Sequence, residues 1–154
     1  MIFKPSRVYL VASEAEGITP LNAFDNALMK AGLADFNLVK VSSVFPPHCE
    51  LVDIVEVPPG SVVPSVYTSF VSKERGEMIA AAISLGIPGD PSKAGVVMEF
   101  SGKVSSIDAR AEAERMVVNA MERRSVRGYV IKSAHVEHGV ESCGCVLAAL
   151  LLLP

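Results

Sequence analysis

The chain has 154 residues and a mass of 16.3 kDa, a length that fits one domain with a sizeable core. Hydrophobic residues make up 50% and charged residues 20%, which excludes disordered, collagen-like and coiled-coil proteins. A formal net charge of −3 gives no global positive field, so we expect neither nucleic acid nor a membrane surface as a partner.

Cysteine usage and the two ends of the chain favour a cytoplasmic protein. Cys49, Cys143 and Cys145 are an odd number of thiols, and the last two flank a single glycine, too close for an ordinary disulfide. The N-terminus has no long apolar core or small-residue cleavage signature, which disfavours a secretory signal. The apolar run at 146–153 is far shorter than the roughly 20 helical residues that cross a bilayer, so it indicates a buried strand or a subunit contact.

The first third of the chain predicts a strand, a helix and a second strand. Residues 7–13 are rich in β-branched and aromatic side chains, which is typical of a strand. Residues 19–32 begin with Thr-Pro and end with Gly, as helices often do. The apolar face expected for this helix consists of Leu21, Phe24, Leu28 and Ala31. Residues 36–45 predict a second strand, stopped by two prolines that cannot donate to a ladder.

The rest of the chain predicts further strands and one more helix. The strands are expected at 49–57, 62–72, 79–87, 95–100, 129–136 and 143–152. Residues 105–124 predict the helix, with Ser105 and Asp108 forming a capping-box variant. Its expected apolar stripe is Ile107, Ala111, Met116, Val117 and Met121.

Two helices cannot cover both faces of so much sheet. The pattern therefore predicts an α+β fold in a single domain spanning 1–154. We expect a four-layer αββα sandwich of two stacked, mainly antiparallel sheets with a helix layer on each outer face.

The usual enzyme signatures are missing from the sequence, which has no GxGxxG, P-loop, HExxH or GxSxG pattern. Cys143-Gly-Cys145, with His135 and His138 upstream, invites a metal interpretation. However, CxC lacks the two-residue gap of zinc knuckles, and its strand pattern points both thiols the same way. We expect no metal and interpret the thiols as small buried hydrophobes.

Ser42 and Ser43 occupy an unusual place, between β-branched residues and just before the double proline. Their surroundings resemble the pyruvoyl-dependent arginine decarboxylases of archaea and some bacteria, and the Ser-Ser-x-x-Pro-Pro core is specific. The resemblance covers nearly the whole chain, in order, through GITPLNAFDNALMKAGL (17–33), NLVKVSSVFPP (37–47), GSVVPSVYTSFVSKERGEMIAAAISLGIP (60–88) and VVMEFSGKVS (96–105).

The resemblance implies that the chain cuts itself between Ser42 and Ser43, giving a β chain of residues 1–42 and an α chain of residues 43–154. The Ser43 hydroxyl would attack the Ser42 carbonyl carbon to form an ester. Elimination then leaves dehydroalanine, which becomes a pyruvoyl group with loss of ammonia. This covalent group would form a Schiff base with L-arginine and accept the electrons released with CO2, giving agmatine without pyridoxal phosphate or a metal.

Three further residues match family site positions. Glu99 is the implied proton donor, and its apolar neighbours should raise its pKa; a solvated edge residue is the alternative. Asn37 is associated with the pyruvoyl site, yet six extended residues place it roughly 20 Å from Ser43, which suggests a neighbouring subunit or a bent strand. Capping of the strand start is its alternative. Asp25 would accept a bidentate pair of hydrogen bonds from the guanidinium, or is merely a solvated helix residue.

The family match implies a homotrimer of αβ units, with a dimer of trimers as the alternative, acting on a small-molecule amino acid. Two other functions stay open on the sequence alone. One is a pyruvoyl decarboxylase for another cationic amino acid, because Asp25 does not separate arginine from lysine or ornithine. The other is a non-catalytic trimeric paralogue, against which the joint presence of Ser42, Ser43, Asn37 and Glu99 argues.

Overall fold

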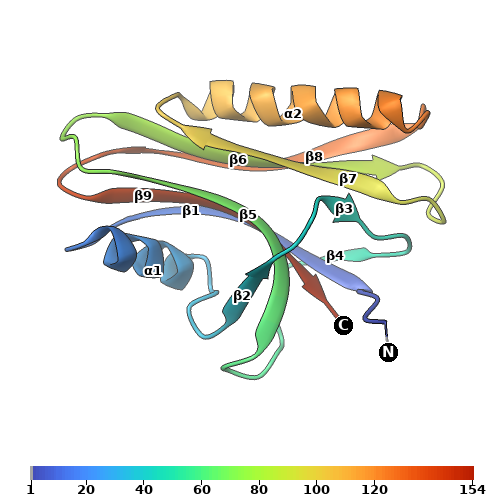
Figure 1. The fold of residues 1–154 in the computed structure, drawn as a ribbon, viewed down its shortest axis with the longest axis horizontal. Coiled ribbons are helices and arrows are strands. Elements are labelled where there is room, and N and C mark those ends of the chain that lie inside the picture. Colours follow the sequence, from blue (N-terminus) through green and yellow to red (C-terminus); the bar gives the residue numbers. More distant parts are fainter. Residues whose placement is uncertain (1) are drawn as a thin grey trace.

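The computed structural model describes residues 2–154, which form nine strands and two helices (Figure 1). In chain order these are β1 (Arg7–Glu16), α1 (Pro20–Lys30), β2 (Asn37–Lys40), β3 (Val44–Phe45), β4 (Glu50–Val52), β5 (Val62–Ser72), β6 (Met78–Pro88), β7 (Gly95–Gly102), α2 (Ser106–Arg123), β8 (Tyr129–Gly139) and β9 (Gly144–Leu153).

The strands form two sheets, which confirms the α+β class. One sheet has the order β2-β5-β9-β1-β4 and the other β3-β7-β6-β8. Pairing is mainly antiparallel, with parallel exceptions at β1–β4 and β2–β5. Helix α1 contacts β1, β5 and β9 of the five-stranded sheet, whereas α2 contacts β6, β7 and β8 of the four-stranded sheet.

The largest apolar core includes residues from both sheets, among them Val8, Val66, Ile83 and Leu150. Every residue of β9 is buried, because this strand lies in the middle of its sheet and alternate side chains enter two different cores. The expectation of a buried strand at 146–153 is confirmed. Among residues 2–154, no helix is both long and apolar enough to cross a membrane.

The predicted helix caps are confirmed, but the predicted helix faces are partly wrong. Thr19 Oγ1 accepts a hydrogen bond from Asn22 N at 3.1 Å, and Ser105 Oγ accepts one from Asp108 N at 3.1 Å. Leu21 and Ile107, expected on the apolar faces, are 75% and 74% exposed. Small residues face the sheets instead and let the helices pack closely, namely Ala23 and Ala27 on α1 and Ala109, Ala113 and Ala120 on α2.

Two strand predictions differ from the structure. Residues 36–45 form two short strands, β2 and β3, rather than one, because the chain leaves the edge of the five-stranded sheet and joins the edge of the four-stranded sheet (Figure 1). Of the alternating stretch 49–57, only Glu50–Val52 is a strand, paired in parallel with the start of β1. Because the chain changes sheets between β2 and β3, Ser42 and Ser43 lie in the segment between the two sheets.

Candidate active site

Ser42 and Ser43 lie in the segment that crosses from β2 to β3. The Val41 N–H donates to the Ser65 carbonyl at 3.0 Å, which holds the near end of the segment on β5. The Val97 N–H donates to the Ser43 carbonyl at 3.1 Å, which holds its far end on β7. The peptide bond between the serines is therefore fixed from both sides.

The carbonyl group of Ser42 lies in a three-residue turn. Its oxygen accepts a hydrogen bond from the Val44 N–H at 3.1 Å. Attack on this carbonyl by the next residue's hydroxyl would place negative charge on the same oxygen, where a backbone donor already points. Ser42 is exposed and Ser43 is half-buried, so the turn holds the attacked group in place without filling the space around it.

Glu99 lies close to this turn along β7. It follows Val97, the partner of Ser43, by two residues, so its side chain is on the same face of the strand about 7 Å farther along. Beyond it, the hydroxyls of Thr68 and Ser101 are 2.7 Å apart and tie β5 to β7. Burial raises the pKa of the Glu99 carboxyl, although Lys40 and its own backbone N–H act in the opposite direction. This carboxyl can therefore keep a proton closer to neutrality than an exposed glutamate can.

Lys40 is a charge near Glu99 that was not predicted from the sequence. The Lys40 Nζ lies 4.9 Å from the centre of the Tyr67 ring, a cation–π distance. The Tyr67 ring is in turn 6.4 Å from that of Phe24 on α1. The available signal was a lysine between two valines, three residues before Ser43, but the sequence does not show that its charge acts on Glu99.

Asn37 and Asp25 are not brought to Ser43 within one chain. Asn37 begins β2, where its Nδ2 donates to the Gly60 carbonyl at 3.2 Å and its N–H to the Ser61 carbonyl at 2.9 Å. Asp25 is exposed on α1, the helix that covers the five-stranded sheet. Within one chain, Glu99 therefore lies near Ser43, whereas Asn37 and Asp25 lie on other surfaces.

The cysteines take no part in this arrangement. Cys143 and Cys145 are both buried in the core between α1 and its sheet, which confirms their interpretation as packing residues. Burial, with the neighbouring Cys143, raises the pKa of Cys145 to about 12, so its thiol is a poor nucleophile at neutral pH. Within residues 2–154, no three His, Cys, Asp or Glu side chains are grouped so as to hold a metal ion.

Comparison with known proteins gives one consistent family. A family model described as pyruvoyl-dependent arginine decarboxylase matches residues 7–154. Proteins of that name from Methanocaldococcus jannaschii and Methanothermobacter thermautotrophicus are 44% and 42% identical over 148 and 151 residues. These alignments cover 96% of this chain and 90% and 96% of the two relatives. A third, from Thermococcus sibiricus, is 37% identical over 153 residues.

Proposed function

Because the chain belongs to the family of pyruvoyl-dependent arginine decarboxylases, we propose that it converts L-arginine to agmatine and CO2 with a pyruvoyl group made from its own Ser43. The observation that carries this proposal is the Ser42–Ser43 turn, held between the two sheets with a backbone donor on the Ser42 carbonyl. A non-catalytic protein has no need of that turn. It also has no need of a half-buried carboxyl on the adjacent strand.

The chain's own groups account for the self-cleavage. The Ser43 hydroxyl adds to the Ser42 carbonyl carbon, and the Val44 N–H stabilises the oxyanion that forms. The C–N bond then breaks and the Ser43 nitrogen takes up a proton, which leaves an ester. Loss of the α-proton and of the Ser42 carboxylate gives dehydroalanine. One water molecule then releases ammonia and leaves the ketone, with residues 1–42 and 43–154 as separate chains.

Glu99 and Asp25 divide the work on the substrate. The pyruvoyl ketone supplies an acceptor for the substrate amine and for the electrons released with CO2. Glu99, whose raised pKa favours the protonated form, delivers a proton to the carbon that has lost CO2. Asp25 accepts two hydrogen bonds from the guanidinium group.

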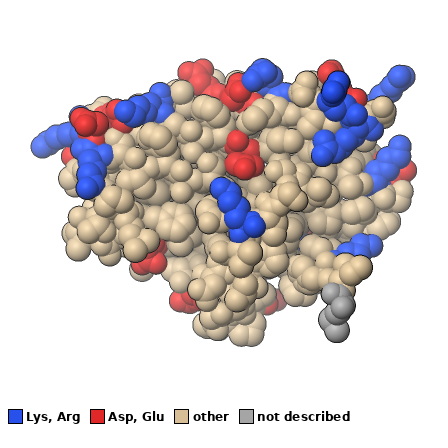
Figure 2. All heavy atoms as spheres, in the orientation of Figure 1, with Lys and Arg blue, Asp and Glu red and all other residues tan. Residues whose placement is uncertain are grey.

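The separation of the site residues supports an active site between subunits of a homotrimer, with a dimer of trimers as the larger alternative. Asn37 and Asp25 would reach the Ser43 and Glu99 of a neighbouring copy. The edge strands on either side of Ser43, β2 and β3, carry the exposed valines Val39 and Val44, which are 46% and 43% exposed. Figure 2 shows charged side chains mainly along α2 and around the rim of the molecule, with basic and acidic groups also at the centre of the view.

Two finer features complete the proposal. The packing of α1 on one sheet and α2 on the other supports a four-layer αββα sandwich, in which both sheets stack between the helices. The three free cysteines support a cytoplasmic location.

The intact mass of the purified protein under denaturing conditions tests the proposed function. We expect two chains that meet at Ser42 and Ser43, the larger with a blocked, ketone-containing N-terminus, together with release of CO2 and agmatine from arginine. A single full-length chain in an inactive preparation would instead support the non-catalytic paralogue.

Asp25→Asn tests recognition of the guanidinium group. The change keeps the side-chain shape but removes the charge, so we expect KM for arginine to rise about 10- to 100-fold, as hydrogen bonds to charged groups contribute about 1.5–3 kcal/mol. Steady-state kinetics with arginine, lysine and ornithine measure the effect. Asp108→Asn, a change at an exposed aspartate of α2, is the control. An unchanged KM for arginine in the Asp25 variant would contradict the assignment.

Lys40→Met tests the charge near Glu99. The Lys40 ammonium lowers the pKa of the Glu99 carboxyl, so its removal lets that pKa rise further. Because the protonated carboxyl is the active form, the fall of kcat at high pH should move to higher pH. Lys93→Met, in the exposed loop before β7, is the matched control. If the fall of kcat in the Lys40 variant moved to lower pH, or did not move, Glu99 would not be the group that causes this fall.

A further inference from the structure

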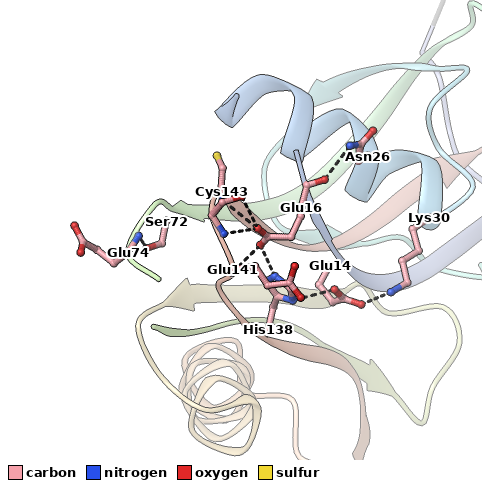
Figure 3. A network of polar contacts seen from close by, with 10 residues as sticks. Glu14, Glu16, Asn26, Lys30, Ser72, Glu74, His138, Glu141 and Cys143 are labelled. Carbon is pink, nitrogen blue, oxygen red and sulfur yellow. Dashed lines mark hydrogen bonds and ion pairs between the residues drawn. The ribbon is translucent and has the colours of Figure 1, made fainter. Parts of the chain in front are cut away.

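A cluster of charged side chains at the end of β1 lies outside the residues assigned so far (Figure 3). His138 of β8 lies between two glutamates of β1. Its Nε2 is 2.6 Å from Glu16 Oε2 and its Nδ1 is 3.1 Å from Glu14 Oε2. The Nε2–Glu16 contact is a hydrogen bond, and the Nδ1–Glu14 contact brings the second carboxylate to the opposite side of the ring. The His138 side chain is 14% exposed, so these contacts are largely withdrawn from water.

Glu16 also holds the loop between β8 and β9. Its Oε1 accepts hydrogen bonds from Ser142 N at 2.7 Å and Cys143 N at 3.0 Å. Burial alone would raise the Glu16 pKa, but the bonds from Ser142, His138 and Cys143 outweigh it and lower the pKa to about 2. A Cβ at Gly144 would lie 2.6 Å from Glu16 Oε2 and 3.0 Å from His138 Nε2. The backbone at Gly144 therefore passes so close to Glu16 and His138 that a larger residue would not fit there.

The same two glutamates connect the cluster to α1. The Glu16 carbonyl accepts a hydrogen bond from Asn26 Nδ2 at 2.9 Å, and Glu14 pairs with Lys30. Figure 3 shows this path, which runs from His138 through Glu16 to one turn of α1 and through Glu14 to the next. The cluster thus ties the helix to the end of β1 and, through His138, to the other sheet.

Two further contacts fix the helix at close range. The Ser13 hydroxyl donates to the Ala27 carbonyl at 2.7 Å and is buried. A Cβ at Gly17 would lie 2.2 Å from Ala23 N, so the chain between β1 and α1 passes directly against the helix backbone. The helix therefore cannot shift without disturbing β1, and Asp25 precedes the Asn26 that bonds to Glu16.

We propose that His138 is a positioning residue for substrate recognition, which holds α1 through Glu16 and Asn26 so that Asp25 meets the guanidinium in bidentate geometry. This inference rests on the proposed role of Asp25. Bidentate pairing needs both oxygens aligned with a planar fork of donors, and a small displacement of the helix spoils that alignment. His138 then affects the binding of arginine without touching it.

Steady-state kinetics on the purified, self-cleaved enzyme test the inference with H138Q, D25N and the double variant. Glutamine has no ring with a nitrogen on each side, so it cannot contact both glutamates from opposite sides. We expect H138Q to raise KM for arginine about 3- to 10-fold, with kcat within about twofold of the original. The double variant should have the same KM as D25N. The amide that D25N introduces no longer forms the charged, bidentate pair with the guanidinium, so a shift of the helix has no such pair to misalign. H135Q, an exposed change on the same strand, should alter neither constant.

The outcomes separate this inference from the proposed function. If D25N raises KM and H138Q does not, His138 is not a positioning residue and the role of Asp25 stands. If the two effects multiply in the double variant, His138 acts elsewhere and the inference is overturned. If D25N leaves KM unchanged, guanidinium recognition by Asp25 and the inference both fall. Should H138Q not fold, N26A replaces it, because Asn26 is exposed and its only contact in the path is the Glu16 carbonyl.

Discussion

Ser43→Ala should yield an uncut chain with no decarboxylase activity above the detection limit. Alanine has no β-oxygen, so it can neither attack the Ser42 carbonyl nor leave in the elimination that creates the ketone. Both the cleavage and the group that accepts the substrate electrons are lost together. Intact mass and agmatine formation measure the two losses. The folded state should survive, because the half-buried Ser43 is held through its backbone carbonyl, which alanine retains.

Ser42→Ala is the matched control at the neighbouring position. In the proposed reaction Ser42 contributes only its carbonyl, and its side chain is exposed. The Val44 N–H can still donate to that carbonyl. Cleavage and activity should therefore be retained. If Ser42→Ala abolished cleavage and Ser43→Ala did not, the nucleophile would be Ser42 and not Ser43.

The local sequence predicts most elements of this fold but not the path of the chain around the serines. The strand at 62–72 and both helix caps could be read directly, because turn residues and capping side chains act over a few positions. The division of 36–45 into two strands could not, because each half is a good strand by itself. Which sheet a half joins is decided by long-range bonds, such as Val41 to Ser65 and Val97 to Ser43.

The site shows the same limit. The family resemblance points to Ser43, Glu99, Asn37 and Asp25, but a single sequence cannot say which of them meet in one chain. The structure brings Glu99 close to Ser43 through the β3–β7 pairing and leaves the other two on separate surfaces. The contacts of His138 were missed altogether. Its sequence neighbourhood suggested a metal, whereas its actual partners lie more than 120 residues away on β1.

Glu99→Gln should reduce kcat about 10²- to 10⁴-fold, the usual contribution of a general acid, while self-cleavage stays complete. Glutamine keeps the shape of the side chain but has no acidic proton to give. The carbon that has lost CO2 must then take its proton from water, which is neither fixed in position nor as acidic. KM for arginine should change little, because in the proposed reaction Glu99 acts after the substrate is bound. Glu74→Gln, at an exposed position in the turn after β5, is the control.

The pH dependence of kcat gives the sharper test of the same residue. Burial raises the Glu99 pKa, so the protonated acid persists toward neutral pH and is lost as pH rises through that pKa. The original enzyme should therefore lose activity on the alkaline side of this pKa. Glutamine does not titrate, so the variant's residual activity should lack that limb. A variant that decarboxylates at the normal rate, or that keeps the same alkaline fall, would show that another group donates the proton.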